Sequence, residues 1–145
     1  MKQINNFILE KLRINKDTIS GVLNEVDVKL LKNFTEKDIE KVINWINNDM
    51  PDDIRPIVIT NTRKNISWDE PGSQIFLFYT ENYNESKPFN IPYIRFFYDD
   101  EGLLVDIYDD QDVKYYCSEK FGSIKDLDKC FDYIESKHDI IKNLI

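Results

Sequence analysis

The chain has 145 residues, of which 41% are hydrophobic and 32% are charged, and its formal net charge is -8. This length is typical of one domain, and this hydrophobic content is enough to build a buried core. The negative charge disfavours direct binding to nucleic acid or to an anionic membrane, because both require clustered Lys and Arg side chains. The sequence lacks an apolar run long enough to span a membrane and a recognisable secretory signal, which predicts a cytoplasmic protein.

The N-terminal part of the chain begins with a predicted helix. Residues 4–13 place apolar side chains on one helical face, and turn-forming residues follow at 15–21. We therefore expect residues 1–145 to form a single acidic α+β domain, in which residues 1–18 are a possible separately packed helical segment. Residues 22–31 fit a helix and a strand equally well, and both interpretations remain open.

Two further helices are predicted, at 35–50 and at 123–136. Thr35 and Asp38 have the spacing of a capping box at the start of the first, and Pro51 follows its end. Both segments repeat apolar residues at helical spacing, which indicates one buried face on each. These residues are Ile39, Val42, Ile43 and Ile46 in the first helix, and Leu127, Phe131 and Ile134 in the second.

The middle of the chain is rich in strand-forming residues. We predict a mainly antiparallel sheet of four or five strands over residues 57–117, covered on one face by the N-terminal helices and the C-terminal helix. The strongest signal is a hairpin in which residues 93–98 and 103–108 flank a turn that contains Gly102. One face of this hairpin should carry Ile94, Phe96, Tyr98, Leu103, Val105 and Ile107.

Acidic residues are concentrated around this hairpin. The stretch from Asp99 to Asp112 contains seven carboxylates and no basic residue. Asp106 is the one placed inside a predicted strand, on the face opposite Val105 and Ile107. The others fall in turns, where they are either solvated or form a surface that binds a protein partner, and both interpretations remain open. The candidate partner-binding residues are Asp99, Asp100, Glu101, Asp109, Asp110 and Asp112, together with Trp68 in a predicted loop.

The sequence offers few residues for catalysis or for metal binding. Its 4 glycines are too dispersed for a phosphate-binding loop, and His138 is the only histidine. The acidic turn does not match the spacing of a calcium-binding EF-hand loop. Cys117 and Cys130 are expected to be small buried apolar side chains. We therefore expect no catalytic residues, no metal and no cofactor.

The predicted strands are also dense in aromatic residues, more than one face of a sheet needs for a core. Tyr and Trp side chains on an open face beside acidic turns are typical of a protein-binding surface. Stacking on nucleic-acid bases would normally require more basic residues than Arg95 and Lys114, the two in these strands.

The opening FILEKLRINKDT, from Phe7 to Thr18, resembles the starts of small proteins encoded by crAss-like gut bacteriophages. For a small acidic protein, this resemblance implies the general character of an inhibitor of host defences, acting in the host cell cytoplasm, or of a minor virion component. Immunity proteins that neutralise toxins share this character.

Together these features favour a non-catalytic inhibitor or antagonist that occupies a basic site on a partner protein. The first alternative is a minor virion structural or assembly protein, which would self-associate. The second is a carboxylate-based enzyme, which would need at least two acids in one pocket. The sequence identifies neither the partner nor the oligomeric state.

Overall fold

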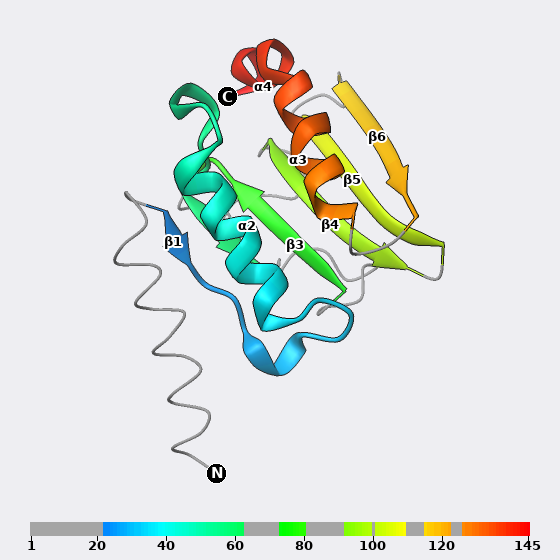
Figure 1. Ribbon diagram of the computed structural model, residues 1–145. Helices are drawn as coiled ribbons and strands as arrows, with labels where there is room; N and C mark the ends of the chain where they lie inside the picture. The colour runs from blue at the N-terminus through cyan, green and yellow to red at the C-terminus, as the bar shows by residue number, and fades with distance from the viewer. Residues whose placement is uncertain (1–21, 63–72, 81–91, 100, 110–114, 123–125) are drawn as a thin grey trace.

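The computed structural model describes residues 22–62, 73–80, 92–99, 101–109, 115–122 and 126–145, with backbone alone at 109 and 115–117. These residues form the predicted α+β fold (Figure 1). The strands are β1 (Leu23–Asn24), β2 (Val58–Thr60), β3 (Gln74–Phe78), β4 (Tyr93–Asp99), β5 (Gly102–Asp109) and β6 (Tyr115–Phe121). The α-helices are α2 (Glu36–Asn48), α3 (Leu127–Ser136) and α4 (His138–Leu144), and the short 3₁₀ helices are η1 (Val28–Leu30) and η2 (Asp52–Ile54). The predicted helical segment at 1–18 lies outside the described residues.

Within the described residues the sheet has six strands, whose order in space follows their order in the chain. Strands β2 to β6 pair antiparallel, as predicted, and β1 pairs parallel with β2. The sheet has one strand more than the four or five predicted. The additional strand is β1, which lies outside the predicted range of 57–117. It comes from the segment that fits both helix and strand, where Val22, Asn24 and Val26 are buried and alternate with more exposed residues. This period of two is that of a strand with one face against a core.

The predicted hairpin is confirmed. Its register places Ile94, Phe96 and Tyr98 opposite Ile107, Val105 and Leu103. Gly102 in the turn has φ of +122°, a backbone conformation that disfavours side chains, and a Cβ there would collide with the carbonyl oxygen of Phe121.

Helix α2 begins at the predicted capping box. The Asp38 backbone N–H donates to Thr35 Oγ1 at 3.2 Å, and the Thr35 N–H donates to the Asp38 carboxylate at 2.8 Å. The helix ends at Asn48, before Pro51. In the described part of the second predicted helix, α3 begins at Leu127, and the chain then continues through Lys137 into α4.

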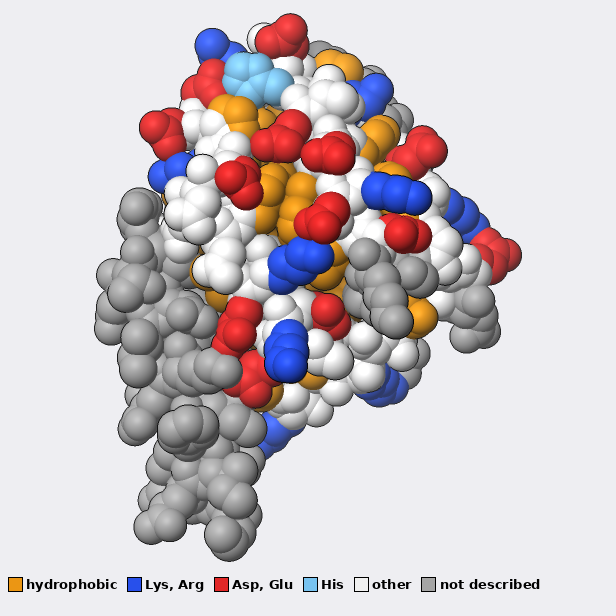
Figure 2. Space-filling model, viewed as in Figure 1, with side chains coloured by type: hydrophobic (Ala, Val, Ile, Leu, Met, Phe, Trp, Pro, Cys, Tyr) orange, Lys and Arg blue, Asp and Glu red, His pale blue; other side chains and the backbone are white. Residues whose placement is uncertain are grey.

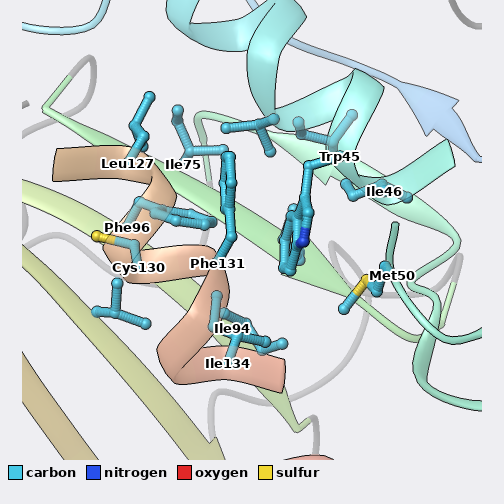
Figure 3. Close-up of a cluster of buried hydrophobic side chains, with 14 of the residues drawn as sticks. Trp45, Ile46, Met50, Ile75, Ile94, Phe96, Leu127, Cys130, Phe131 and Ile134 are labelled. Carbon is cyan, nitrogen blue, oxygen red and sulfur yellow. The ribbon is translucent and has the colours of Figure 1, made fainter. Parts of the chain in front are cut away.

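The main core lies between the sheet and helices α2 and α3, which cover one of its faces (Figure 1). Trp45 of α2 and Phe131 of α3 stack on each other between the two helices, with ring centroids 4.3 Å apart and planes 9° from parallel (Figure 3). Phe131 also meets Phe96 of β4 edge to face. The apolar patterns of α2, α3 and the hairpin correctly predict these buried residues: Ile39, Val42, Ile43, Ile46, Phe96, Val105, Leu127, Phe131 and Ile134.

The opposite face of the sheet carries a second set of buried side chains. Arg95 of β4 and Asp106 of β5 are direct cross-strand partners, and Arg95 Nε donates to Asp106 Oδ2 at 2.9 Å. Asp106 is 1% exposed and Arg95 is 8% exposed, so both charges are buried. The Arg95 guanidinium also lies 4.9 Å from the centre of the Phe97 ring. A buried apolar cluster on this face contains Val58, Phe76, Phe78 and Tyr93.

Candidate functional site

The acidic hairpin turn is largely occupied by interactions within the chain. Asp99 Oδ1 accepts a hydrogen bond from the Glu101 backbone N–H at 2.8 Å. The Glu101 carboxylate pairs with Lys120 of β6, and this hydrogen bond raises the pKa of the lysine. Both members of the pair are exposed to solvent. The side chains of Asp99 and Glu101 therefore already interact with groups of the turn and of β6.

The structure brings together only these two of the predicted partner-binding residues. Asp109 is described as backbone in β5. Asp100, Asp110, Asp112 and Trp68 lie outside the described residues. Whether the acidic hairpin binds a partner stays a prediction.

A different acidic site lies between α2 and α3. Two hollows of about 410 and 180 Å³ adjoin there and share Trp45, Asp49, Asp128 and Phe131 as lining residues. We call them together the α2–α3 groove. Figure 2 shows apolar side chains at the bottom of this region with acidic side chains on both sides. The remaining lining residues are Asp132 and Glu135 in the larger hollow and Lys41, Asn44 and Asn48 in the smaller one.

The floor of the groove is the stacked pair of Trp45 and Phe131, which are 4% and 5% exposed. Their rings come from different helices, so the relative position of α2 and α3 determines the shape of the floor (Figure 3). The indole Nε1 of Trp45 is buried and has no hydrogen-bond partner among the described residues. Buried N–H groups in proteins nearly always have a partner, so this unpaired donor requires an explanation.

The rim of the groove is acidic. Its four carboxylates and one lysine give the lining a formal charge of -3. Lys41 Nζ pairs with Asp128 Oδ1 at 3.2 Å. In the part of the chain that the structure describes, the side chains of Asp49, Asp132 and Glu135 form no ion pair. Three carboxylates are therefore left to interact with a cation from outside.

Helical spacing brings this acidic rim together. Asp128, Asp132 and Glu135 are separated by four and three residues, so they lie along one side of α3. They flank the buried stripe that contains Phe131. This signal is present in the sequence, but it is less conspicuous than the contiguous acidic stretch at the hairpin.

The chemistry of the groove favours binding a cationic group. Carboxylates only accept hydrogen bonds, so the rim favours donors that carry positive charge. Among the described residues, no group of three or more His, Cys, Asp and Glu side chains is arranged to hold a metal ion.

His138, the only histidine, lies in a separate polar cluster. Its Nε2 is 2.7 Å from Asp53 Oδ1 of η2, and Lys142 Nζ is 3.5 Å from Asp53 Oδ2. The hydrogen bond with Asp53 raises the pKa of His138, and the same bond lowers the pKa of Asp53. This cluster joins α4 to η2 on the surface.

Cys130 of α3 belongs to the main core (Figure 3). Burial raises the pKa of its thiol to about 12, so the reactive thiolate is disfavoured. The prediction of a small buried apolar side chain is therefore confirmed for Cys130, and the side chain of Cys117 lies outside the described ones.

No helix in the described part of the chain is long and apolar enough to cross a membrane. Comparison with protein-family models, with curated proteins and with solved structures found no match to this chain.

Proposed function

We propose that this chain is a non-catalytic protein-binding module, of the inhibitor or antagonist kind, that occupies a basic site on a partner protein. The observation that carries this proposal is the α2–α3 groove, where unpaired carboxylates surround a floor of two stacked aromatic rings. A polar rim around an apolar centre is the arrangement of many protein interfaces. The resemblance of residues 7–18 to phage proteins supports a role against host defences.

Charge and aromatic surface would contribute to binding in different ways. A chain with a net charge of -8 attracts a basic partner over several ångströms and so raises the association rate. The groove floor would contribute less, because Trp45 and Phe131 are only 4% and 5% exposed and have little surface left to bury.

The groove is a better candidate than the hairpin turn. Glu101 already pairs with Lys120, and Asp99 already accepts a backbone hydrogen bond. A partner would have to displace these interactions before it gained its own. Within the described residues, Asp132 and Glu135 have no interaction that a partner would first have to displace.

A carboxylate-based enzyme is the less favoured alternative. The groove does bring several acids to one hollow, and a carboxylate-based enzyme needs at least two acids in one pocket. However, Asp49, Asp128 and Asp132 are exposed, whereas a general acid needs burial that shifts its protonation toward neutral pH. An exposed acidic rim favours binding over catalysis.

The test is affinity capture from the cells in which the chain is naturally made, with two matched double variants. Asp132→Asn with Glu135→Gln removes two negative charges from the groove. Glu101→Gln with Glu119→Gln removes the same charge from the turn after β4 and from β6. Wild type and the second variant should capture the same protein with a basic surface, and the groove variant should not.

Equal capture by both variants would exclude the groove as the binding site. Sedimentation of the purified chain provides a second measurement. Regular self-association without a captured partner would overturn the proposal in favour of a virion structural or assembly protein.

A further inference from the structure

We propose that helix α4 is a pH-sensitive latch, which protonated His138 holds closed against η2 and which opens locally when this histidine loses its proton. Opening of α4 requires no partner, so it is independent of the proposed function. Three features of the helix support the proposal: its junction with α3, the small apolar surface that docks it, and a cluster of charges where it meets η2.

The junction with α3 allows α4 to move separately. Lys137 alone lies between the two helices, and its backbone is not helical, with φ of -100° and ψ of 18°. A few backbone angles at such a residue can absorb the movement of a whole element. The seven residues of α4 are too few for a helix that is stable by itself in water. The helix therefore depends on its contact with the rest of the chain.

The apolar part of that contact is small. Ile141 is 1% exposed and is the one fully buried side chain of α4, and Leu144 packs partly buried against the main core. The helix also meets η2, next to the C-terminus of the chain (Figure 1). One buried side chain holds the helix weakly enough for polar contacts to change how often it opens.

A cluster of charges forms the polar part of the contact. His138 Nε2 is 2.7 Å from Asp53 Oδ1, and Lys142 Nζ is 3.5 Å from Asp53 Oδ2. His138 and Lys142 are four residues apart, so they lie on the same side of α4 and face one carboxylate of η2. Loss of the proton removes the ion pair between His138 and Asp53. It also weakens their hydrogen bond, because hydrogen bonds between two charged groups are the stronger ones.

The charged groups of α4 itself move with His138. Asp139 Oδ1 is 3.4 Å from His138 Nδ1, Lys142 lies one turn further along the helix, and Lys137 precedes it. The positive end of the helix dipole also stays beside the ring. These influences on the proton of His138 are therefore similar in the docked and the undocked helix.

The charged groups on the η2 side are Asp52, Asp53 and Arg55. Asp52 pairs with Arg55 at 2.8 Å, and the same guanidinium donates to two carbonyl oxygens at the end of α2. Asp53 is thus the charge that His138 gains on docking, and their hydrogen bond raises the pKa of His138. Docking is therefore favoured most below the ordinary value of ~6.5, and this advantage is lost as the pH rises through the docked value.

The experiment measures local opening of α4 in the full chain by amide hydrogen exchange, followed by NMR between pH ~5 and ~8. Dividing each exchange rate by the intrinsic rate at the same pH leaves the opening constant. The reporter is the Ile141 amide, which donates to the Lys137 carbonyl oxygen at 3.0 Å. The Tyr98 amide of β4, which donates to the Ser73 carbonyl oxygen at 2.9 Å, reports unfolding of the sheet.

In the wild type, the Ile141 amide should open more readily than the Tyr98 amide at every pH, and its opening constant should rise with pH. The rise should match the difference in His138 pKa between wild type and Asp53→Asn, at about tenfold for each unit of pKa. Asp53→Asn and His138→Gln should open more readily than wild type at low pH and show no such rise.

Asp128→Asn is the matched control, because it removes the same charge from an exposed ion pair with Lys41. It should show the wild-type dependence on pH. Three results would overturn the proposal: equal opening constants for Ile141 and Tyr98, a wild-type opening constant of Ile141 that does not change with pH, or the same rise in Asp53→Asn as in wild type. Protection of the Tyr98 amide shows in each variant that the domain is folded.

Discussion

The buried ion pair between Arg95 and Asp106 leads to the most quantitative prediction. Asp106→Asn keeps the shape of the side chain and removes its charge. Arg95, which is 8% exposed, would then keep its positive charge in a site that excludes water. Breaking a buried pair by removing one partner typically costs ~3–5 kcal/mol. Because domains of this kind are stable by only ~5–15 kcal/mol, the variant should lose a large share of its stability.

Replacing both members tests the cause of this loss. Arg95→Met together with Asp106→Leu removes both charges and fills the site with apolar side chains of similar length. This double variant should be more stable than Asp106→Asn alone, because neither charge of the pair remains buried. Urea is the suitable denaturant, since it is uncharged, and unfolding can be followed by circular dichroism and by tryptophan fluorescence.

Glu101→Gln provides the control, because it breaks the solvent-exposed pair with Lys120 in the same sheet. It should change the free energy of unfolding much less than Asp106→Asn. A loss below ~1 kcal/mol for Asp106→Asn would match an exposed pair and refute the reasoning from burial. A double variant that is less stable than Asp106→Asn would also contradict it.

Three further predictions concern the helix start, the hairpin turn and the surface histidine. Thr35→Ala should destabilise the fold by ~1 kcal/mol in urea denaturation, because it removes one half of the capping box, whereas Thr35→Ser should retain most of the stability. Gly102→Ala should cost ~1–3 kcal/mol or more through its strained backbone, and an unchanged melting temperature would show that the turn can relax. The pKa of His138, measured by NMR titration, should lie above its usual value and fall in Asp53→Asn. Since the pKa is raised in the folded state, the stabilisation from this histidine is complete below its unfolded value of ~6.5 and is lost as the pH rises through the folded value. A His138 pKa that Asp53→Asn leaves unchanged would contradict the assigned cause.

Much of the fold could be predicted from local patterns. The spacing of apolar residues in α2 and α3 reflects a helix with one buried face, and the capping box at Thr35 depends only on residues within one turn. Strand β1 could not be predicted in the same way. It is a two-residue strand whose hydrogen bonds are made with β2, so it depends on residues more than thirty positions away in the chain.

The sequence of the hairpin also indicates a cross-strand ion pair, in addition to the buried apolar face. Its turn sets the register, and the register that pairs Phe96 with Val105 also places Arg95 opposite Asp106. Once the strands were predicted, the cross-strand ion pair followed from counting residues. Its burial did not, because that depends on how tightly the second face of the sheet is enclosed.

The density of acidic residues along the chain does not indicate the α2–α3 groove. The hairpin acids are contiguous, whereas Asp128, Asp132 and Glu135 are separated by other residues and converge only on a helix. Asp49, directly after the end of α2, lines the same hollow, and no local sequence pattern indicates that it lies near the acids of α3. The burial of Trp45 and its unpaired Nε1 are properties of packing between two helices, which the predicted apolar stripe of α2 does not include.

The order of the strands has a consequence for how the chain folds. From β2 to β6 each strand pairs with the next one along the chain, so most of the sheet forms through contacts between neighbouring segments, and low contact order favours rapid folding. The pairing of Leu23 with Val58 is different, because it closes a loop that contains the whole of α2. Among the described strands β1 also lies at the edge of the sheet, where β2 is its only neighbour. Strand β1 should therefore join last and open first, and its amides should exchange with solvent while the β2–β6 meander remains protected.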